Sequence, residues 1–367
     1  MRLGVGAALV GRRLIPGDVE VADGVVTAYG LGSPNGPGRG IVTPGFVDLQ
    51  VNGFGGVDLL EADAEGFRRA GDALLETGVT AYLPTFITAP EEQILAALSE
   101  LPIASGGPRI LGVHLEGPFL SPARLGTHPA AYRRDPDPAL LQRLIDAGPV
   151  RLVTLAPELP GAEELVDLLH LRRITVSAGH TDASAAEGER AFDQGIRTVT
   201  HLFNAMRPLR HRDPGLVGAA LAREDVVVQV IVDGIHLAGE TAKVVWRAAA
   251  GRVALVTDAI SSAGVTGNDG TSSLGGFEVS IRDGVARGPD GVLAGSLLTM
   301  IEAVRNLHEL GAPLEDALTA ATAVPANVIS ERAAGWLDVG LPADLLVLDD
   351  NLEIERVLIG GEARVVA

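Results

Sequence analysis

The sequence predicts an α/β protein: a (β/α)8 TIM-like barrel with a small β-sandwich domain built from both chain ends. Three observations lead to this fold. Eight apolar runs alternate with helical or loop segments from residue 41 to about residue 261, strand-like stretches occur near both ends of the chain, and the total of 367 residues leaves room for a barrel of about 250 residues. We assign residues 1–43 and 335–367 to the small β domain and residues 44–334 to the barrel.

Both ends of the chain have strand character. Within the first 40 residues, the Asp-Gly pair at 23–24 lies between β-branched residues, which predicts a hairpin turn. Toward the other end, residues 341–349 and 356–361 form similar apolar runs. Because the two parts look alike, we expect them to pair into one small domain beside the barrel.

The eight runs of the barrel are rich in Val, Ile, Leu and Thr and end in polar residues. Such runs suit strands that are buried on both faces, as in a parallel sheet. The predicted strands are 41–51, 80–88, 109–115, 150–155, 174–178, 198–202, 226–232 and 253–257. The predicted helices between them are 64–77, 90–101, 138–147, 161–171, 185–194 and 239–250.

A hairpin-like region, 274–293, follows the eighth run and has Asp-Gly turns at 283–284 and 290–291. A long helix comes next, with Ser296 as its expected N-cap and Gly311 as its end. One or two further helices are expected over 313–331 before the chain returns to strands.

The composition excludes several classes of function. The chain has no cysteine, so disulfides, iron–sulfur clusters, thiolate zinc sites and a cysteine nucleophile are ruled out. Its formal net charge of −18 disfavours nucleic acid and anionic membranes as partners. We find no apolar run of membrane-spanning length and no secretory signal, so we expect a cytoplasmic protein without a membrane partner.

Lysine chemistry is also disfavoured. Lys243 is the only lysine of the chain, and it lies within a predicted helix, away from the strand ends. A carbamylated lysine that bridges two metal ions is therefore not expected, and neither is a Schiff-base aldolase. The end of the first strand reads Gln50-Val51-Asn52, where many barrel hydrolases place a His-x-His pair. One tightly held metal ion is the simplest expectation.

Four reactive side chains end four different strands. They are Glu116, His180, His201 and Asp258. In a barrel the carboxyl ends of the strands meet at one face, so we expect these side chains to converge. A single histidine at a strand end would more often be a structural residue. Two imidazoles and a carboxylate together suit a zinc-type ion with an open position for water, and Asp258 could act beside that water as a base.

Basic residues gather after the sixth strand in an otherwise acidic chain. They are Arg207, Arg210, His211 and Arg212. Charge alone favours a solvated loop, but the loop follows a strand end at the predicted catalytic face. An anionic substrate group such as phosphate is therefore a reasonable expectation.

Motifs along nearly the whole chain carry a family resemblance. They are the segments 44–53 (PGFVDLQVNG), 114–119 (HLEGPF), 126–128 (GTH), 177–180 (SAGH), 201–206 (HLFNAM), 212–215 (RDPG), 233–236 (DGIH), 256–259 (VTDA) and 342–349 (PADLLVLD). Together they resemble the amidohydrolase superfamily, and within it the family of N-acetylglucosamine-6-phosphate deacetylases.

The resemblance implies residue roles. Glu116, His180 and His201 would bind one divalent metal ion, with zinc as the first expectation and iron(II) as the other. Asp258 would be the catalytic acid and base, and His128 would help to polarise the acetamide carbonyl. Gln50 and Asn52 stand at the His-x-His position, which matches a branch with one metal and leaves open a second, weak metal there.

The resemblance also implies how the substrate is held. His236, Arg212 and the backbone of Asn204 and Ala205 would contact the phosphate. Arg212 could reach across an interface, which implies a homodimer. The implied reaction, in amino-sugar catabolism or cell-wall recycling, is hydrolysis of a linear amide: N-acetyl-D-glucosamine 6-phosphate would give glucosamine 6-phosphate and acetate.

Three alternatives remain open. The sugar could be N-acetylgalactosamine 6-phosphate or an unphosphorylated N-acetyl sugar. A metal-dependent aldolase on a similar barrel would release no acetate and fits the position of Asp258 less well. A scaffold that lost its site is disfavoured, because Glu116, His180, His201 and Asp258 are all present.

Overall fold

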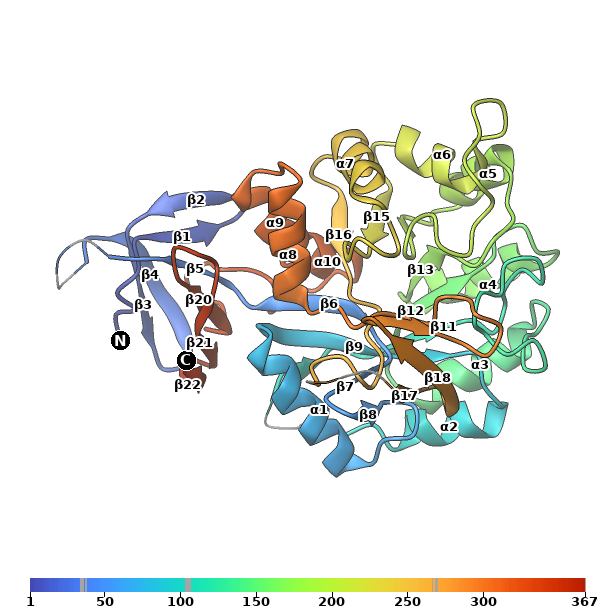
Figure 1. Cartoon of the computed structure of the whole chain (residues 1–367), viewed down its shortest axis with the longest axis horizontal. Helices are drawn as coiled ribbons and strands as arrows, with labels where there is room; N and C mark the ends of the chain where they lie inside the picture. Colours follow the sequence, from blue (N-terminus) through green and yellow to red (C-terminus); the bar gives the residue numbers. More distant parts are fainter. Residues whose placement is uncertain (34–35, 37, 103–106, 266, 268–269, 367) are drawn as a thin grey trace.

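A nearly closed barrel of eight parallel strands dominates the molecule (Figure 1). The computed structural model describes every residue except 34–35, 37, 103–106, 266, 268–269 and 367. The strands, in order around the barrel, are β6 (Phe46–Val51), β9 (Val79–Ile87), β11 (Val113–Glu116), β12 (Val150–Leu155), β13 (Thr175–Ala178), β14 (Thr198–Val199), β15 (Val227–Val230) and β16 (Val253–Leu255). A parallel bridge between Val51 and Ala259 spans the gap between the first and last strands. The predicted fold class is confirmed.

Helices lie between the strands and cover the barrel (Figure 1). They are α1 (Ala64–Glu76), α2 (Glu91–Ser99), α3 (Pro138–Ala147), α4 (Ala162–Leu171), α5 (Ala185–Asp193), α6 (Gly215–Ala222), α7 (Gly239–Ala248), α8 (Met300–Glu309), α9 (Leu314–Ala320) and α10 (Ala323–Val328). All six helices predicted between the strands are present. Helix α6 was not predicted; it begins at Gly215, after Pro214, which provides no side-chain cap, and it is apolar over most of its surface.

The predicted start of α8 is wrong. The N-cap is Thr299, whose backbone N–H and hydroxyl both donate to the carboxylate of Glu302. Ser296, the expected cap, lies four residues before the helix. Its backbone N–H donates to the Asp258 carbonyl at 2.8 Å, and its hydroxyl donates to the Thr257 carbonyl. Ser296 therefore holds the end of β16, next to the predicted site.

Segments from both chain ends form a six-stranded sheet beside the barrel (Figure 1). Its order is β2 (Arg13–Pro16), β1 (Ala7–Val10), β5 (Ile41–Pro44), β20 (Leu345–Leu348), β21 (Ile354–Ile359) and β22 (Glu362–Val366). The hairpin β3 (Asp18–Ala22) and β4 (Val25–Leu31) packs against this sheet, and the two share one apolar cluster. The domain ranges 1–43, 44–334 and 335–367 stay predictions, and they include residues outside the described part of the chain.

The first predicted strand is two strands. Gly45 separates β5, which belongs to the end sheet, from β6, which begins the barrel. A Cβ atom at position 45 would lie 2.0 Å from the hydroxyl oxygen of Thr80, so only glycine fits at this crossing.

A three-stranded sheet is inserted between β16 and α8. It consists of β17 (Gly270–Leu274), β18 (Phe277–Arg282) and β19 (Val285–Arg287), with the predicted turn at 283–284. This region was predicted as a hairpin over 274–293, and the structure adds a strand before it. Three short strands complete the described part of the chain: β7 (Gly53–Phe54), β8 (Val57–Asp58) and β10 (Arg109–Ile110). Among the described residues, no helix is long and apolar enough to cross a membrane.

Candidate metal centre and active site

The ends of four barrel strands bring Glu116, His180, His201 and Asp258 together. Glu116 is the last residue of β11, and the other three follow within three residues of β13, β14 and β16. His180, His201 and Asp258 have left-handed backbone, with φ of 48°, 27° and 51°. Non-glycine residues seldom adopt this conformation, and it gathers at functional sites, where the surrounding structure holds the strain. The sharp turns redirect the chain just where each side chain enters the barrel mouth.

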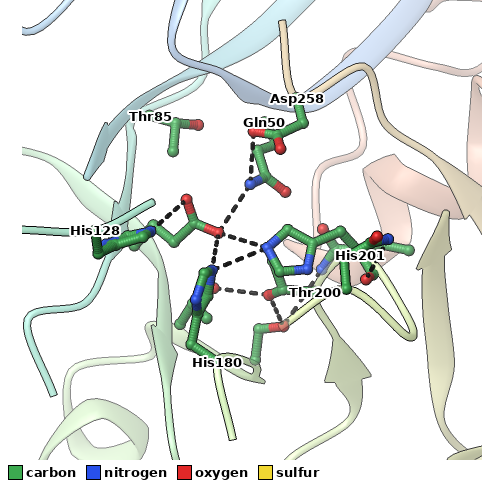
Figure 2. Close-up of polar contacts among 12 residues, drawn as sticks. Gln50, Thr85, His128, His180, Thr200, His201 and Asp258 are labelled. Atoms are coloured by element: carbon green, nitrogen blue, oxygen red, sulfur yellow. Dashed lines mark hydrogen bonds and ion pairs between the residues drawn. The ribbon is translucent and has the colours of Figure 1, made fainter. Parts of the chain in front are cut away.

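Glu116, His180 and His201 form a tight cluster. The Oε1 atom of Glu116 lies 2.9 Å from Nε2 of His201 and 3.2 Å from Nε2 of His180, and the two Nε2 atoms are 3.1 Å apart. All three side chains are buried. Figure 2 shows the rings of His180 and His201 directed toward one point, with His128 beside them. The convergence predicted from the strand ends is present.

The donor set fits a divalent metal ion. Nδ1 of His180 faces the backbone carbonyl of Arg124 at 3.1 Å, and a carbonyl can only accept, so Nδ1 carries the hydrogen. The lone pair of Nε2 therefore faces the carboxylate oxygen of Glu116, an arrangement that needs a cation between them. Two imidazole nitrogens and one carboxylate oxygen are ligands that zinc and iron(II) both accept.

The pKa values of Glu116 and His180 agree with this fit; for His201, burial is outweighed by the neighbouring Glu116 carboxylate, which raises the pKa of the ring. Burial opposes the charged form of Glu116, but the neighbouring imidazoles of His128, His180 and His201 hold the pKa of its carboxyl well below the ordinary value. Burial also lowers the pKa of His180 to about 4, so its ring is neutral near pH 7. An ionised carboxylate and a neutral imidazole are the forms that bind metal.

Asp258 is held beside the cluster by two amides. Its Oδ1 atom accepts hydrogen bonds from Asn52 Nδ2 at 2.7 Å and from Gln50 Nε2 at 3.0 Å. The same Gln50 nitrogen donates to Glu116 Oε1 at 2.9 Å. Burial, with the nearby charge of Glu116, raises the pKa of Asp258 to about 6. A carboxylate with such a pKa can take up and return a proton near neutral pH.

His128 presents an N–H group to the site. Nδ1 of His128 lies 2.9 Å from the Thr88 hydroxyl and 3.3 Å from the Thr88 backbone N–H; the N–H can only donate, so Nδ1 accepts and Nε2 carries the hydrogen. Nε2 lies 3.5 Å from Oε2 of Glu116 and lines the open space above the cluster. His128 is therefore oriented as a donor toward a substrate oxygen.

A pocket of about 230 Å³ opens above these residues. Nδ1 of His236 bonds to Asp233 Oδ2 at 2.7 Å, which leaves Nε2 of His236 for a ligand. The N–H of Asn204 donates to the carbonyl of His201, whereas the N–H of Ala205 has no acceptor among the described residues. The pocket lining is Asn52, Ile87, Glu116, Gly126, Thr127, His128, His180, His201, Asn204, Ala205, His236, Asp258, Leu274, Val292, Leu293 and Gly295.

Arg212 lies outside this pocket. It is exposed and is not part of the pocket lining. Arg207 of the same basic cluster is paired with Asp213 at 2.8 Å and with Asp182 at 3.6 Å. A single chain therefore does not bring the predicted phosphate-binding arginine to the site.

Two parts of the site were missed in the sequence. Thr88 orients His128, and it could have been found because it ends the predicted strand 80–88. The inserted sheet and its flanks supply Leu274, Val292 and Leu293 as one wall of the pocket. Nothing in the local pattern of a hairpin indicates that it folds back over a barrel mouth.

Comparisons with known proteins agree with this geometry. The profile described as "Amidohydrolase family" matches residues 41–364. The N-acetylglucosamine-6-phosphate deacetylase of Homo sapiens is 40% identical over 344 residues, which cover 89% of this chain and 83% of that protein. The N-acetylgalactosamine-6-phosphate deacetylase of Escherichia coli O157:H7 is 34% identical over 354 residues, 94% of this chain and 93% of that protein.

Solved structures give the same result. The N-acetylglucosamine-6-phosphate deacetylase of Thermotoga maritima superposes with a TM-score of 0.92 at 31% identity and covers 100% of both chains. A mutant of the Mycobacterium smegmatis enzyme, in complex with N-acetyl-D-glucosamine-6-phosphate, superposes with a TM-score of 0.93 at 35% identity and covers 100% of this chain and 99% of that one.

Proposed function

The chain belongs to the amidohydrolase family, and from this membership and the geometry of its site we propose its reaction. It is a metal-dependent N-acetylglucosamine-6-phosphate deacetylase, which hydrolyses the N-acetyl group of N-acetyl-D-glucosamine 6-phosphate to glucosamine 6-phosphate and acetate. The observation that carries this conclusion is the convergence of Glu116, His180 and His201 beside Asp258. The similar proteins named above, one of them in complex with this sugar phosphate, support it.

One metal ion held by Glu116, His180 and His201 is the proposed cofactor, and zinc is the proposed identity, with iron(II) as the alternative. When bound, such an ion polarises the amide carbonyl and lowers the pKa of a water molecule toward neutrality. The amide nitrogens of Gln50 and Asn52 donate to Glu116 and Asp258, whereas their amide oxygens have no partner among the described residues. We propose a single ion because Glu116, His180 and His201 offer one set of three ligand atoms.

Asp258 is the proposed acid and base. It takes the proton of the attacking water while the new C–O bond forms at the acetamide carbon. It then returns that proton to the sugar nitrogen as the C–N bond breaks, because an amide anion is too poor a leaving group by itself. Gln50 and Asn52 fix the Asp258 carboxylate for both transfers.

His128 is the proposed donor to the carbonyl oxygen. Negative charge develops on that oxygen as water adds, and the Nε2–H of His128 is already oriented to stabilise it. Because Thr88 fixes the ring through its hydroxyl and its backbone N–H, little reorganisation is needed during the reaction.

The phosphate is proposed to lie at the other side of the pocket, against His236 and the backbone around Asn204 and Ala205. Arg212 is exposed in the single chain, so we propose a homodimer in which Arg212 of the partner subunit completes the phosphate site. We also propose that the enzyme acts in the cytoplasm, in amino-sugar catabolism or cell-wall recycling. A fold that uses no disulfide is compatible with this location.

A second candidate substrate is N-acetylgalactosamine 6-phosphate, which the similarity to the Escherichia coli O157:H7 deacetylase favours. The two sugars differ only at C4, so the same machinery would serve both.

An acetate-release assay tests these proposals. Purified protein is given N-acetylglucosamine 6-phosphate, its galactosamine epimer, or N-acetylglucosamine without phosphate. We expect the glucosamine phosphate to react fastest, the unphosphorylated sugar to react poorly, and a chelator to abolish the activity until zinc is restored. Equal rates with and without the phosphate would contradict the proposed phosphate site, and full activity in metal-free protein would contradict the proposed cofactor.

A further inference from the structure

A chain of hydrogen bonds runs inside the barrel, one layer below the metal cluster. The ring of His114 is completely buried; its Nδ1 lies 3.1 Å from the Leu49 carbonyl and its Nε2 lies 2.7 Å from the hydroxyl of Thr154. The Thr154 hydroxyl lies 2.7 Å from that of Thr200, which in turn lies 2.5 Å from that of Ser177. The chain therefore links strand β6 to β11, β12, β13 and the turn after β14.

Only one assignment of donors and acceptors satisfies every hydrogen bond of this chain. The Leu49 carbonyl can only accept, so Nδ1 of the neutral His114 ring donates and Nε2 accepts. Thr154 must then give its single hydroxyl hydrogen to His114, and it accepts from Thr200. By the same argument, Thr200 accepts from Ser177.

Gln229 closes the chain at its far end. Because the hydroxyl hydrogen of Ser177 is already used, Ser177 can only accept from the Gln229 amide nitrogen, which lies 3.5 Å away. The same nitrogen donates to Thr198 at 3.0 Å, and the Gln229 oxygen has no partner among the described residues. The amide orientation of Gln229 thus agrees with the direction set at His114.

The residues of this hydrogen-bond chain lie close in sequence to each proposed metal ligand. Figure 2 shows Thr200 and His201 together. The pairs are Thr200 directly before His201, His114 two residues before Glu116, and Ser177 three residues before His180. Thr154 is different, because its strand β12 supplies no ligand. An effect of Thr154 on the metal must therefore pass through its hydrogen bonds.

We propose that the chain from His114 through Thr154 and Thr200 to Ser177 positions the three ligands for the metal, so that His114 and Thr154 are positioning residues for the reaction. The inference rests on the proposed function, since it assumes a metal at Glu116, His180 and His201. Ligands must be held within about half an ångström of their bonding geometry, and partners beyond the ligands typically change metal affinity about 10- to 100-fold. A hydrogen-bond chain with only one possible assignment of donors and acceptors supplies that rigidity, because no hydroxyl can rotate without breaking a hydrogen bond.

The competing explanation is that the hydroxyls only fill space in the barrel. The same molecule offers a control, because the hydroxyl of Thr80 on β9 is buried with no partner in the described part of the chain. Thr80→Val removes a buried hydroxyl and keeps the shape of the side chain, and it leaves the hydrogen-bond chain intact. Thr154→Val removes one that is bonded on both sides.

The experiment measures metal binding directly. Wild-type protein and the Thr154→Val, Thr154→Ser and Thr80→Val variants are stripped of metal. Their zinc dissociation constants are then measured by competition with a chromophoric chelator. The visible absorption of each cobalt(II)-loaded protein reports the ligand geometry, and unfolding of the metal-free proteins reports stability. We expect Thr154→Val to weaken zinc binding about 10- to 100-fold and to alter the cobalt spectrum. Thr154→Ser and Thr80→Val should match wild type in zinc affinity and in the cobalt spectrum.

Two results would overturn the proposal. If Thr154→Val keeps the zinc affinity and the cobalt spectrum of wild type, the hydroxyl contributes only to packing and does not position the ligands. This conclusion holds even if the metal-free variant is less stable. Equal weakening in Thr154→Val and in Thr154→Ser, which keeps the hydroxyl, would show that zinc binding does not depend on the hydrogen bonds of Thr154. If Thr154→Val does not fold, Thr154→Ala, which removes the same hydroxyl from the same strand, carries the test. Wild-type protein that binds neither ion would instead contradict the proposed function itself.

Discussion

Asp258 receives hydrogen bonds from Gln50 and Asn52 but is not one of the three clustered ligands. Replacing it with Asn keeps the shape and removes the ability to accept a proton. We expect Asp258→Asn to lower kcat about 100- to 10,000-fold while the bound metal stays near one ion per chain. Acetate release and metal analysis on the same preparation check this. An Asp135→Asn variant at an exposed site serves as control, and near-wild-type turnover in Asp258→Asn would remove this residue from its proposed role.

Asp48 predicts a dependence of stability on pH. It is buried below the site and bonded to the Thr257 hydroxyl at 2.6 Å, and burial raises its pKa from 3.8 to about 7. The folded state therefore favours the protonated form. The stability due to this group is complete below pH 4 and is lost as the pH rises toward about 7.

Asp48→Asn resembles the protonated form at every pH, because its amide has nearly the same shape as the carboxylic acid and carries no charge. We expect the unfolding free energy of the variant, relative to that of wild type, to be higher at pH 8 than at pH 5 by about 2 to 3 kcal/mol. Thermal or urea unfolding at the two pH values measures this difference. If the unfolding free energies of variant and wild type differ by the same amount at pH 5 and at pH 8, Asp48 does not titrate in this range.

The reactive residues of the site could be predicted because barrel topology places strand ends together. Glu116, His180 and His201 are polar residues that end apolar runs, and this signal needs no knowledge of distant contacts. The exposure of Arg212 could not be predicted, because a charged loop looks the same whether it faces its own pocket or solvent. The wall from the inserted sheet depends on how that sheet folds back, which no local pattern encodes.

At the scale of elements, the end of α4 carries backbone strain. Arg173, just after its C-cap, has φ of 57°, a conformation that favours glycine. We expect Arg173→Gly to raise the unfolding free energy by about 1 kcal/mol, because the left-handed conformation no longer crowds a Cβ atom. Arg173→Ala, which removes the same charge but keeps Cβ, is the matched control. Equal stability of the two variants would contradict the strain argument.

Most elements could be predicted from the sequence, and their errors have physical causes. The six amphipathic helices between the strands show a clear periodicity, whereas α6 is apolar over most of its surface and shows none. The strand predicted over 41–51 divides at Gly45, because an unbroken apolar run does not show that its two halves join different sheets. Ser296 satisfies the rule for a helix cap as well as Thr299 does, and only the tertiary bond to Thr257 assigns it elsewhere.

At the scale of the whole molecule, the position of Arg212 gives a test of the proposed dimer. If each pocket takes Arg212 from the partner subunit, Arg212→Ala and Asp258→Asn homodimers should both be nearly inactive. A mixed dimer has one pocket with both native residues, so co-expression of the two variants should restore up to about half of the wild-type activity per dimer. Differently tagged subunits allow the mixed dimer to be isolated. Absence of recovery would place Arg212 and Asp258 in the same subunit's site or exclude Arg212 from it.

The inserted sheet β17–β19 forms an apolar cluster with Ile87 and Ile260 at the barrel mouth, and this cluster is separate from the main core of the barrel. It nevertheless supplies Leu274 to the pocket, and Val292 and Leu293 follow from the segment just after it. Substitutions in this module can therefore reshape the cavity without replacing Glu116, His180 or His201. Evolution could adjust the preferred sugar epimer or acyl chain here while the hydrolytic chemistry stays intact, which makes the module the natural target for redesigning selectivity.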